Sequence, residues 1–207
     1  MLTIDEIISS EKFVEKLRLT VNDLKLPSNS RARAAGACLA IAQDHHHGIV
    51  RLVNDKLYAS AASLVRVAFE AYVRGEWLHW CASDEVVTSF LMGKEPPSLN
   101  CLITQLEMLD SFDGGVLSMV KRESWGPMCG YTHTGGLHVQ RWITERGIEP
   151  NYSREEIIEL LKFAEVIATF AVMGTLQLAN EIESMANAPD IISQRMEEWA
   201  SFATLNK

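Results

Sequence analysis

The chain has 207 residues, of which 47% are hydrophobic and 22% are charged, and its formal net charge is −8 at pH 7. This composition is that of an ordinary globular protein, and the length suits a single domain over residues 1–207 with a sizeable core. Broad electrostatic binding of nucleic acid needs clustered lysine and arginine, which an acidic chain lacks. A local basic pocket is still compatible with this net charge.

The N-terminus, Met1-Leu-Thr-Ile-Asp-Glu, is acidic and lacks the apolar stretch of a signal peptide. No apolar run reaches the ~20 residues that span a bilayer, and the longest candidate, residues 163–178, is interrupted by Glu165 and Gln177. The four cysteines form no Cys-x-x-Cys pair, which argues against a zinc ribbon or a redox motif. We therefore expect a cytoplasmic protein with reduced thiols and no membrane partner.

Apolar residues recur at helical spacing along most of the chain. Capping boxes at Thr3-x-x-Glu6 and Ser153-x-x-Glu156 mark the starts of the first helix and of the longest one. The pattern predicts helices over about 4–24, 30–57, 59–82, 84–92, 98–111, 116–123, 154–185 and 189–202. The predicted fold is all-α, a single-domain helical bundle with a long helix in its C-terminal half.

The stretch from Trp125 to Trp142 differs from the rest because it contains four glycines and a proline. These residues disfavour one straight helix, so we expect a glycine-rich, broken helical segment that consists of short helical pieces around bends. The following residues, 146–152, are predicted to form a loop.

Three charged residues lie at i, i+4 and i+8 in an otherwise apolar helix: Arg66, Glu70 and Arg74. This spacing puts them on one face, where the carboxylate can pair with both guanidinium groups. A surplus of one positive charge remains, and burying it is costly without a further partner. Two interpretations follow, a sealed core network completed by another acid such as Asp44, or a site that faces an anion or a substrate.

Two histidine segments could contribute to such a site. His45, His46 and His47 are consecutive on a helix and point about 100° apart, so they cannot bind one metal together. One of them, taken as His46, is expected to face inward. His133 stands among hydroxyls and glycines in Tyr131-Thr-His-Thr-Gly-Gly, where it could act as a general acid or base or be a satisfied core residue.

The sequence carries no signal for a cofactor. It contains no glycine-rich phosphate loop after a strand and no His-Glu-x-x-His. We expect no metal and no cofactor.

The segments Arg66-x3-Glu-Ala-Tyr-Val-Arg-Gly-x-Trp-Leu and Tyr131-Thr-His-Thr-Gly-Gly together resemble a family of all-helical bacterial proteins that are classified as domains of unknown function. The resemblance covers residues 44–152. It implies that Arg66, Glu70, Arg74 and His133 form one catalytic set that converges in space. The other matching positions, which we assign to binding, are Tyr131, Thr132, Trp77 and a histidine of the 45–47 run, His46.

These proteins are distantly similar to HEPN-like helical bundles, many of which belong to toxin–antitoxin or phage-defence loci. The resemblance implies a metal-independent enzyme that acts on RNA. It also implies that the protein forms a homo-oligomer and that the product of a neighbouring gene is a partner. Arg74 and His79 also match the Arg-x4-6-His spacing of HEPN ribonucleases, but His79 lies about 140° around the helix from Arg74.

Two alternatives stay open on the sequence. The Arg/Glu/His set could bind a small anion or nucleotide in a non-enzymatic sensor module, or it could be a sealed network in a structural, oligomeric bundle. The three hypotheses differ in the solvent exposure of the set, which must open to a cleft for catalysis, line an enclosed pocket for sensing, or be fully buried for a structural role.

Overall fold

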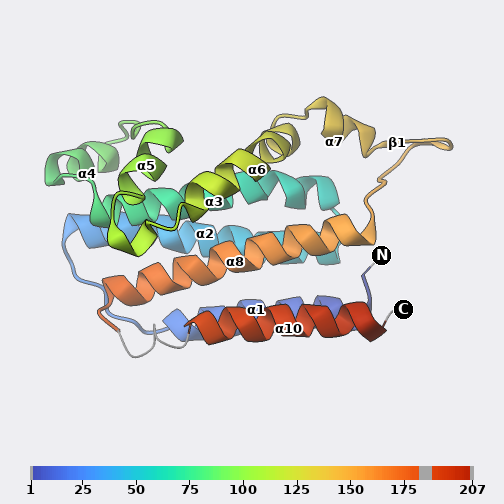
Figure 1. Ribbon diagram of the computed structural model, residues 1–207, viewed down its shortest axis with the longest axis horizontal. Coiled ribbons are helices and arrows are strands. Elements are labelled where there is room, and N and C mark those ends of the chain that lie inside the picture. The colour runs from blue at the N-terminus through green and yellow to red at the C-terminus, as the bar shows by residue number, and fades with distance from the viewer. Residues whose placement is uncertain (1, 182–187, 206–207) are drawn as a thin grey trace.

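The computed structural model describes residues 2–181 and 188–205, and over these residues the fold is all-α, as predicted (Figure 1). The helices are α1 (Ile4–Val21), α2 (Ser30–Asn54), α3 (Tyr58–Trp80), α4 (Asp84–Leu91), α5 (Leu99–Leu106), α6 (Val116–Thr132), α7 (Gly136–Gln140), α8 (Arg154–Leu178) and α10 (Ala188–Leu205). A 3₁₀ turn covers Asp110–Phe112, and β1 (Ile143–Thr144) pairs antiparallel with β2 (Gly147–Ile148). No helix in this part of the chain is both long and apolar enough to cross a membrane.

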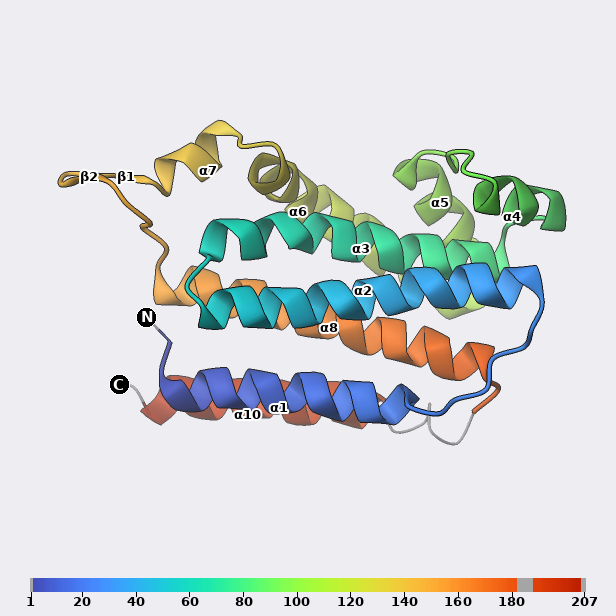
Figure 2. The ribbon, with the colours of Figure 1, turned by 180° about the vertical axis from the view of Figure 1, so that it is seen from behind.

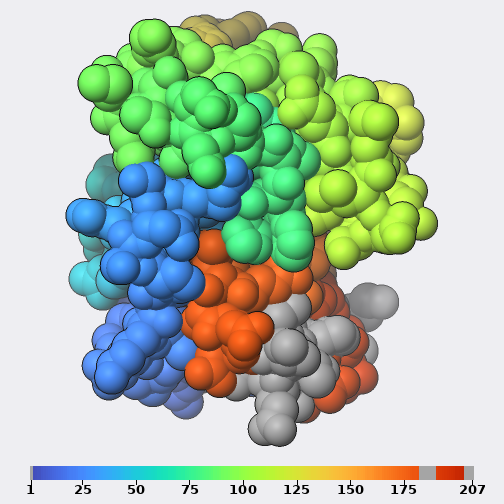
Figure 3. Space-filling model, turned by 90° about the vertical axis from the view of Figure 1, so that its left-hand side faces the viewer, coloured from blue at the N-terminus to red at the C-terminus, as the bar shows by residue number. Residues whose placement is uncertain are grey.

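The helices stack in layers, with the two ends of the chain on one side (Figures 1 and 2). α1 and α10 form the outer layer, α2 and α8 lie above them, and α3 lies on α2 and α8. α5 and α6 pack on the far side of α3, and α7 with the β1–β2 hairpin projects beyond it. Figure 3 shows the end of the molecule away from the hairpin, where the green segment of α4 and α5 lies above the blue start of α2.

α2 and α3 make the most extensive helix pair because small residues line their contact. Ala35 and Ala42 of α2 and Ala61 of α3 are fully buried. A Cβ on Gly75 would lie 2.8 Å from the side chain of Leu39, so the helices can approach this closely only with glycine at that position. This contact holds the charged face of α3 in a fixed orientation.

α1, α8 and α10 are joined by a buried ion pair that the sequence analysis did not predict. The side chains of Arg195 and Glu165 are each 1% exposed and lie 2.6 Å apart between Nη2 and Oε1. Ser10 accepts from Arg195 and donates to Glu165, and Trp199 Nε1 donates to Glu165 at 2.7 Å. Glu165 therefore does not interrupt the apolar face of α8 but is fully hydrogen-bonded within it.

Three helices end earlier than predicted, the first of them α1, which ends at Val21 and is followed by Asp23 at φ 62°. α2 ends at Asn54 instead of Leu57, because Lys56 takes a left-handed conformation with φ 60° and the Leu57 N–H donates back to Leu52. α8 ends at Leu178 in the same way, with Asn180 at φ 61°. This left-handed closure satisfies the last carbonyl groups of a helix. Residues 182–185 of the predicted longer helix lie outside the described residues.

The prediction of a segment broken from residue 125 onward was wrong in its first part. α6 continues through Gly126, Pro127 and Gly130 to Thr132. Gly126 and Pro127 are solvent-exposed, so water can take the carbonyl that the proline leaves without a donor. The break comes afterwards, where Thr134 has φ 54° and the Gly135 N–H donates 2.7 Å to the Gly130 carbonyl.

Two further boundaries differ from the prediction. The helix expected over 98–111 divides into α5 and the 3₁₀ turn. Part of the loop expected over 146–152 forms β2, which pairs Ile148 with Ile143. Strands this short carry no apolar alternation, which is the signal by which strands are found in a sequence.

Candidate functional site

The charged stripe of α3 is paired along the helix, as its spacing predicts. Arg66 Nε donates to Glu70 Oε1 at 2.8 Å, and Arg74 Nη2 lies 3.9 Å from Glu70 Oε2. The second contact is an ion pair, and it is too long to be a hydrogen bond. Arg74 Nε is buried and has no hydrogen-bond partner among the described residues. Glu70 therefore holds Arg66 firmly and leaves Arg74 with unused donors.

The C-terminal turn of α6 is fixed to α3 one turn before Arg66. The Ser63 hydroxyl donates to the Tyr131 carbonyl at 3.1 Å, and the Thr132 hydroxyl lies 3.3 Å from the Ser63 carbonyl. The same hydroxyl donates to the Met128 carbonyl at 2.9 Å within α6. His133 is the next residue and caps the helix, so these contacts determine where its ring lies.

Arg66 and His133 are in direct contact. The distance between Arg66 Nη1 and His133 Nε2 is 2.5 Å. A guanidinium group can only donate, so Nε2 is the acceptor in this contact. The contact therefore places an imidazole nitrogen beside a permanent positive charge.

Trp125 completes the surroundings of Arg66. The guanidinium carbon lies 4.6 Å from the centroid of the Trp125 ring, and Lys121 Nζ lies 5.3 Å from it. A cation at this distance is attracted to the negative face of the indole. Two basic side chains thus gather around one tryptophan on a chain whose net charge is −8.

The four residues Arg66, Glu70, Arg74 and His133, here called the Arg66 cluster, are open to solvent. The side chains of the first three are 22%, 21% and 30% exposed, and His133 is exposed. The two arginines and one glutamate leave a surplus of one positive charge beside the histidine. The sealed network that was considered for this position exists instead at Arg195 and Glu165.

The other residues proposed for the site lie in different surroundings. Thr132 holds the end of α6, as described above. The Tyr131 ring packs edge-on against His138 with centroids 5.1 Å apart. Trp77 is buried and donates to Gln105 at 2.7 Å.

His46 is the member of the histidine run that faces inward. It is 2% exposed and packs edge-on against Phe13 of α1, away from the Arg66 cluster. Burial lowers its pKa to about 3, and the neighbouring positive groups act in the same direction. Asp44, considered as a possible fourth charge, is exposed on α2.

Among the described residues, no group of three or more His, Cys, Asp and Glu side chains could hold a metal ion. The chemistry of the Arg66 cluster is that of two cationic donors and an imidazole, which suits a phosphate or another oxyanion. Sequence reasoning missed Ser63, Lys121 and Trp125. Their only signal was their place on helices that later proved to pack together.

The fold and this cluster define an all-helical bundle protein with an exposed Arg–His pair between α3 and α6. A family model matches residues 39–198, and the chain belongs to that family, a family of unknown function called DUF6988. Comparisons with curated proteins and with solved structures gave no match.

Proposed function

We propose that the protein is a HEPN-like, metal-independent enzyme that acts on RNA, with the Arg66 cluster as its phosphate-binding and catalytic site. The observation that carries the proposal is the 2.5 Å contact between Arg66 and His133 on a solvent-open surface. A neutral imidazole can accept a proton at neutral pH, and a guanidinium beside it can hold the phosphate on which the reaction takes place.

The reaction is cleavage by the ribose 2′-hydroxyl. Arg74 is 30% exposed and its Nη2 makes only a long ion pair with Glu70, so the end of its guanidinium can donate to a non-bridging phosphate oxygen. Arg66 reaches the same phosphate when Nη1 leaves His133. This movement frees His133 Nε2 to take the 2′-hydroxyl proton as the oxygen attacks phosphorus. The bond to the 5′ oxygen breaks and that oxygen takes a proton from water, giving a 2′,3′-cyclic phosphate and a 5′-hydroxyl. The hydroxide that remains takes the proton from His133, which restores the histidine.

Glu70 acts through Arg66, since its hydrogen bond to Nε keeps the guanidinium plane aimed at His133. Trp125 lies against the same guanidinium and gives the site an aromatic surface on which a base can stack. In HEPN ribonucleases the arginine and histidine of two protomers meet, whereas here one chain supplies both. A homo-oligomer would add a second histidine as the general acid.

The test is cleavage of an end-labelled single-stranded RNA by the purified protein in the presence of EDTA. We expect products with 2′,3′-cyclic phosphate ends, and a loss of cleavage in His133→Gln and Arg66→Gln. Arg18→Gln is the matched control, because Arg18 is an exposed α1 residue that pairs with Glu15. The assay is repeated with the products of neighbouring genes, as expected for a toxin–antitoxin or phage-defence locus. Intact RNA under all these conditions would rule out the enzymatic proposal.

A non-enzymatic site for a small anion or nucleotide is the second candidate. One observation favours it: among the described residues, His133 supplies the one imidazole that hydrogen-bonds to Arg66. Efficient RNA cleavage uses both a general base and a general acid. Titration calorimetry with inorganic phosphate and with nucleotides separates the two candidates, because binding that requires Arg66 and Arg74, with no cleavage, supports the sensor module.

A further inference from the structure

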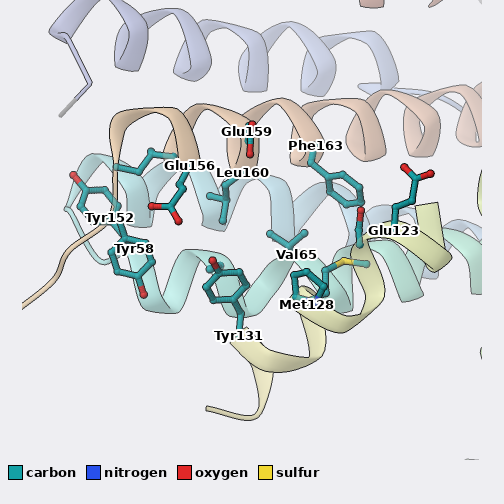
Figure 4. A pocket seen from close by; sticks show the side chains of 14 residues that line it. Tyr58, Val65, Glu123, Met128, Tyr131, Tyr152, Glu156, Glu159, Leu160 and Phe163 are labelled. Carbon is teal, nitrogen blue, oxygen red and sulfur yellow. The ribbon is translucent and has the colours of Figure 1, made fainter. Parts of the chain in front are cut away.

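A separate pocket of about 290 Å³ lies between α3, α6 and α8 (Figure 4). Its floor is apolar and includes Val65, Leu160 and Phe163. It arises because α6 packs on α3, which leaves a space alongside α8. The volume is at the lower end of the range for small-molecule sites, so the pocket suits a ligand of modest size.

Three tyrosines stand in the walls of this pocket. Tyr58 of α3 and Tyr152, just before α8, have ring centroids 5.6 Å apart, and Tyr131 of α6 lies across from Glu156 (Figure 4). All three are partly exposed, so parts of their rings are accessible. Aromatic faces gathered around an apolar floor attract a positively charged group that carries little water, such as a quaternary ammonium.

The charges around the pocket select the same kind of ligand. Glu123, Glu156 and Glu159 line it, and no Lys, Arg or His is among its lining residues. Glu156 is already paired with Arg141, and Glu123 lies 3.3 Å from Arg122. Glu159 is exposed and makes no ion pair with another described residue, so its charge remains available to a ligand. An anion would be repelled, and a strongly hydrated cation would gain nothing from the apolar floor.

We propose that this pocket binds a small organic cation, an aryl or alkyl ammonium whose apolar body rests on the floor and whose charged group lies among the tyrosine rings near Glu159. This site does not depend on the proposed action on RNA. The two sites have opposite charge preferences, and α6 contributes to both, through Trp125 beside Arg66 and through the ring of Tyr131 in the pocket.

Titration calorimetry with benzyltrimethylammonium tests the proposal, with benzyl alcohol and phenylacetate as the neutral and anionic comparisons. We expect saturable binding of the ammonium compound, much weaker binding of the alcohol, and none of phenylacetate. Tyr131→Leu should weaken the affinity about fivefold, whereas Tyr131→Phe should keep it because the ring remains. Glu159→Gln should weaken it about threefold, since one exposed charge contributes little in water. Glu15→Gln, which removes an exposed carboxylate on α1, should have no effect.

The proposal is overturned if phenylacetate or benzyl alcohol binds as tightly as the ammonium compound, or if none of the three shows saturable binding. It is also overturned if the ammonium binds equally well to the native protein and to Glu159→Gln and Tyr131→Leu. Circular dichroism of each variant checks its folding. Because Glu159 is exposed, Glu159→Gln keeps the test decisive even if Tyr131→Leu does not fold.

Discussion

Arg66 of α3 and His133 at the end of α6 are 67 residues apart in the sequence, and their side chains lie 2.5 Å apart. Three contacts hold the guanidinium of Arg66 in place: Glu70 at Nε, the Trp125 ring at 4.6 Å from the guanidinium carbon, and His133 at Nη1. A side chain restrained in this way loses little further entropy when it binds an anion. The preorganisation is what makes the pair suited to binding a phosphate.

The Arg66 cluster is expected to serve function more than stability. Arg74→Gln should change the free energy of unfolding by less than about 1 kcal/mol, because Arg74 is 30% exposed and its ion pair with Glu70 is long. RNA cleavage, or anion binding if the site is a sensor, should fall about 100-fold with the loss of a charged donor. Urea unfolding and the activity assay on the same preparation measure both. A loss of about 3 kcal/mol or more would instead make Arg74 a buried structural charge.

Arg195 should behave in the opposite way. Arg195→Ala removes the partner of a carboxylate that is 1% exposed and that also binds Ser10 and Trp199. Breaking one side of a buried pair costs about 3–5 kcal/mol because the other charge is left uncompensated. Urea unfolding should show this loss, while Arg18→Ala, on the exposed face of α1, should stay within about 0.5 kcal/mol of the native protein. Equal stability of the two variants would contradict the prediction.

The burial of Glu76 predicts how the stability of the protein changes as the pH approaches neutrality. It is 3% exposed, accepts from Trp80 Nε1 at 3.2 Å, and lies so close to Gly174 that a Cβ there would be 2.2 Å from Oε1. Burial raises its pKa from 4.5 to about 7. Between pH 4.5 and pH 7 the folded state therefore keeps a proton that the unfolded state has released. The free energy of unfolding falls as the pH rises through this range.

Glu76→Gln removes this titration and keeps an oxygen that can accept from Trp80. The variant should gain stability relative to the native protein as the pH rises from 4.5, reaching a difference of up to about 3 kcal/mol above pH 7. Urea unfolding at pH 5, 6, 7 and 8 measures the difference. Stability curves that run parallel over this range would show that the carboxyl ionises freely in the folded state.

The helical period alone was enough to predict the α3 half of the cluster, since residues at i, i+4 and i+8 must share a face. That His133 belongs with Arg66 followed from the family resemblance, because the packing of α6 on α3 depends on contacts such as Ser63 with Tyr131 that no local pattern encodes. Trp125 was missed for the same reason. Its segment was expected to consist of short helical pieces around bends, yet α6 continues through Gly126 and Pro127, which face solvent.

The sealed network was unpredictable for a related reason. Glu165 and Arg195 are on different helices, and each alone looks like a solvent-facing charge or an interruption of an apolar face. Their pairing depends on α10 returning along α8 and α1, which is a long-range property of the fold. The single inward histidine was anticipated, but the identity of the aromatic residue that it meets, Phe13, was not.

The last prediction concerns the stability of the protein in acid, which depends on His46. Its folded pKa is lowered to about 3, mainly by burial and further by His47 and Arg195, while the unfolded chain has the ordinary value near 6.5. Below pH 6.5 the unfolded state therefore binds a proton that the folded state refuses, and stability is lost as the pH falls from 6.5 towards 3. His46→Leu removes the titrating group and is of similar volume. Relative to the native protein, this variant should gain stability on acidification, by up to about 5 kcal/mol at the low end. Urea midpoints at pH 7, 5.5 and 4 provide the measurement, and an unchanged difference between the two proteins at all three values would refute it.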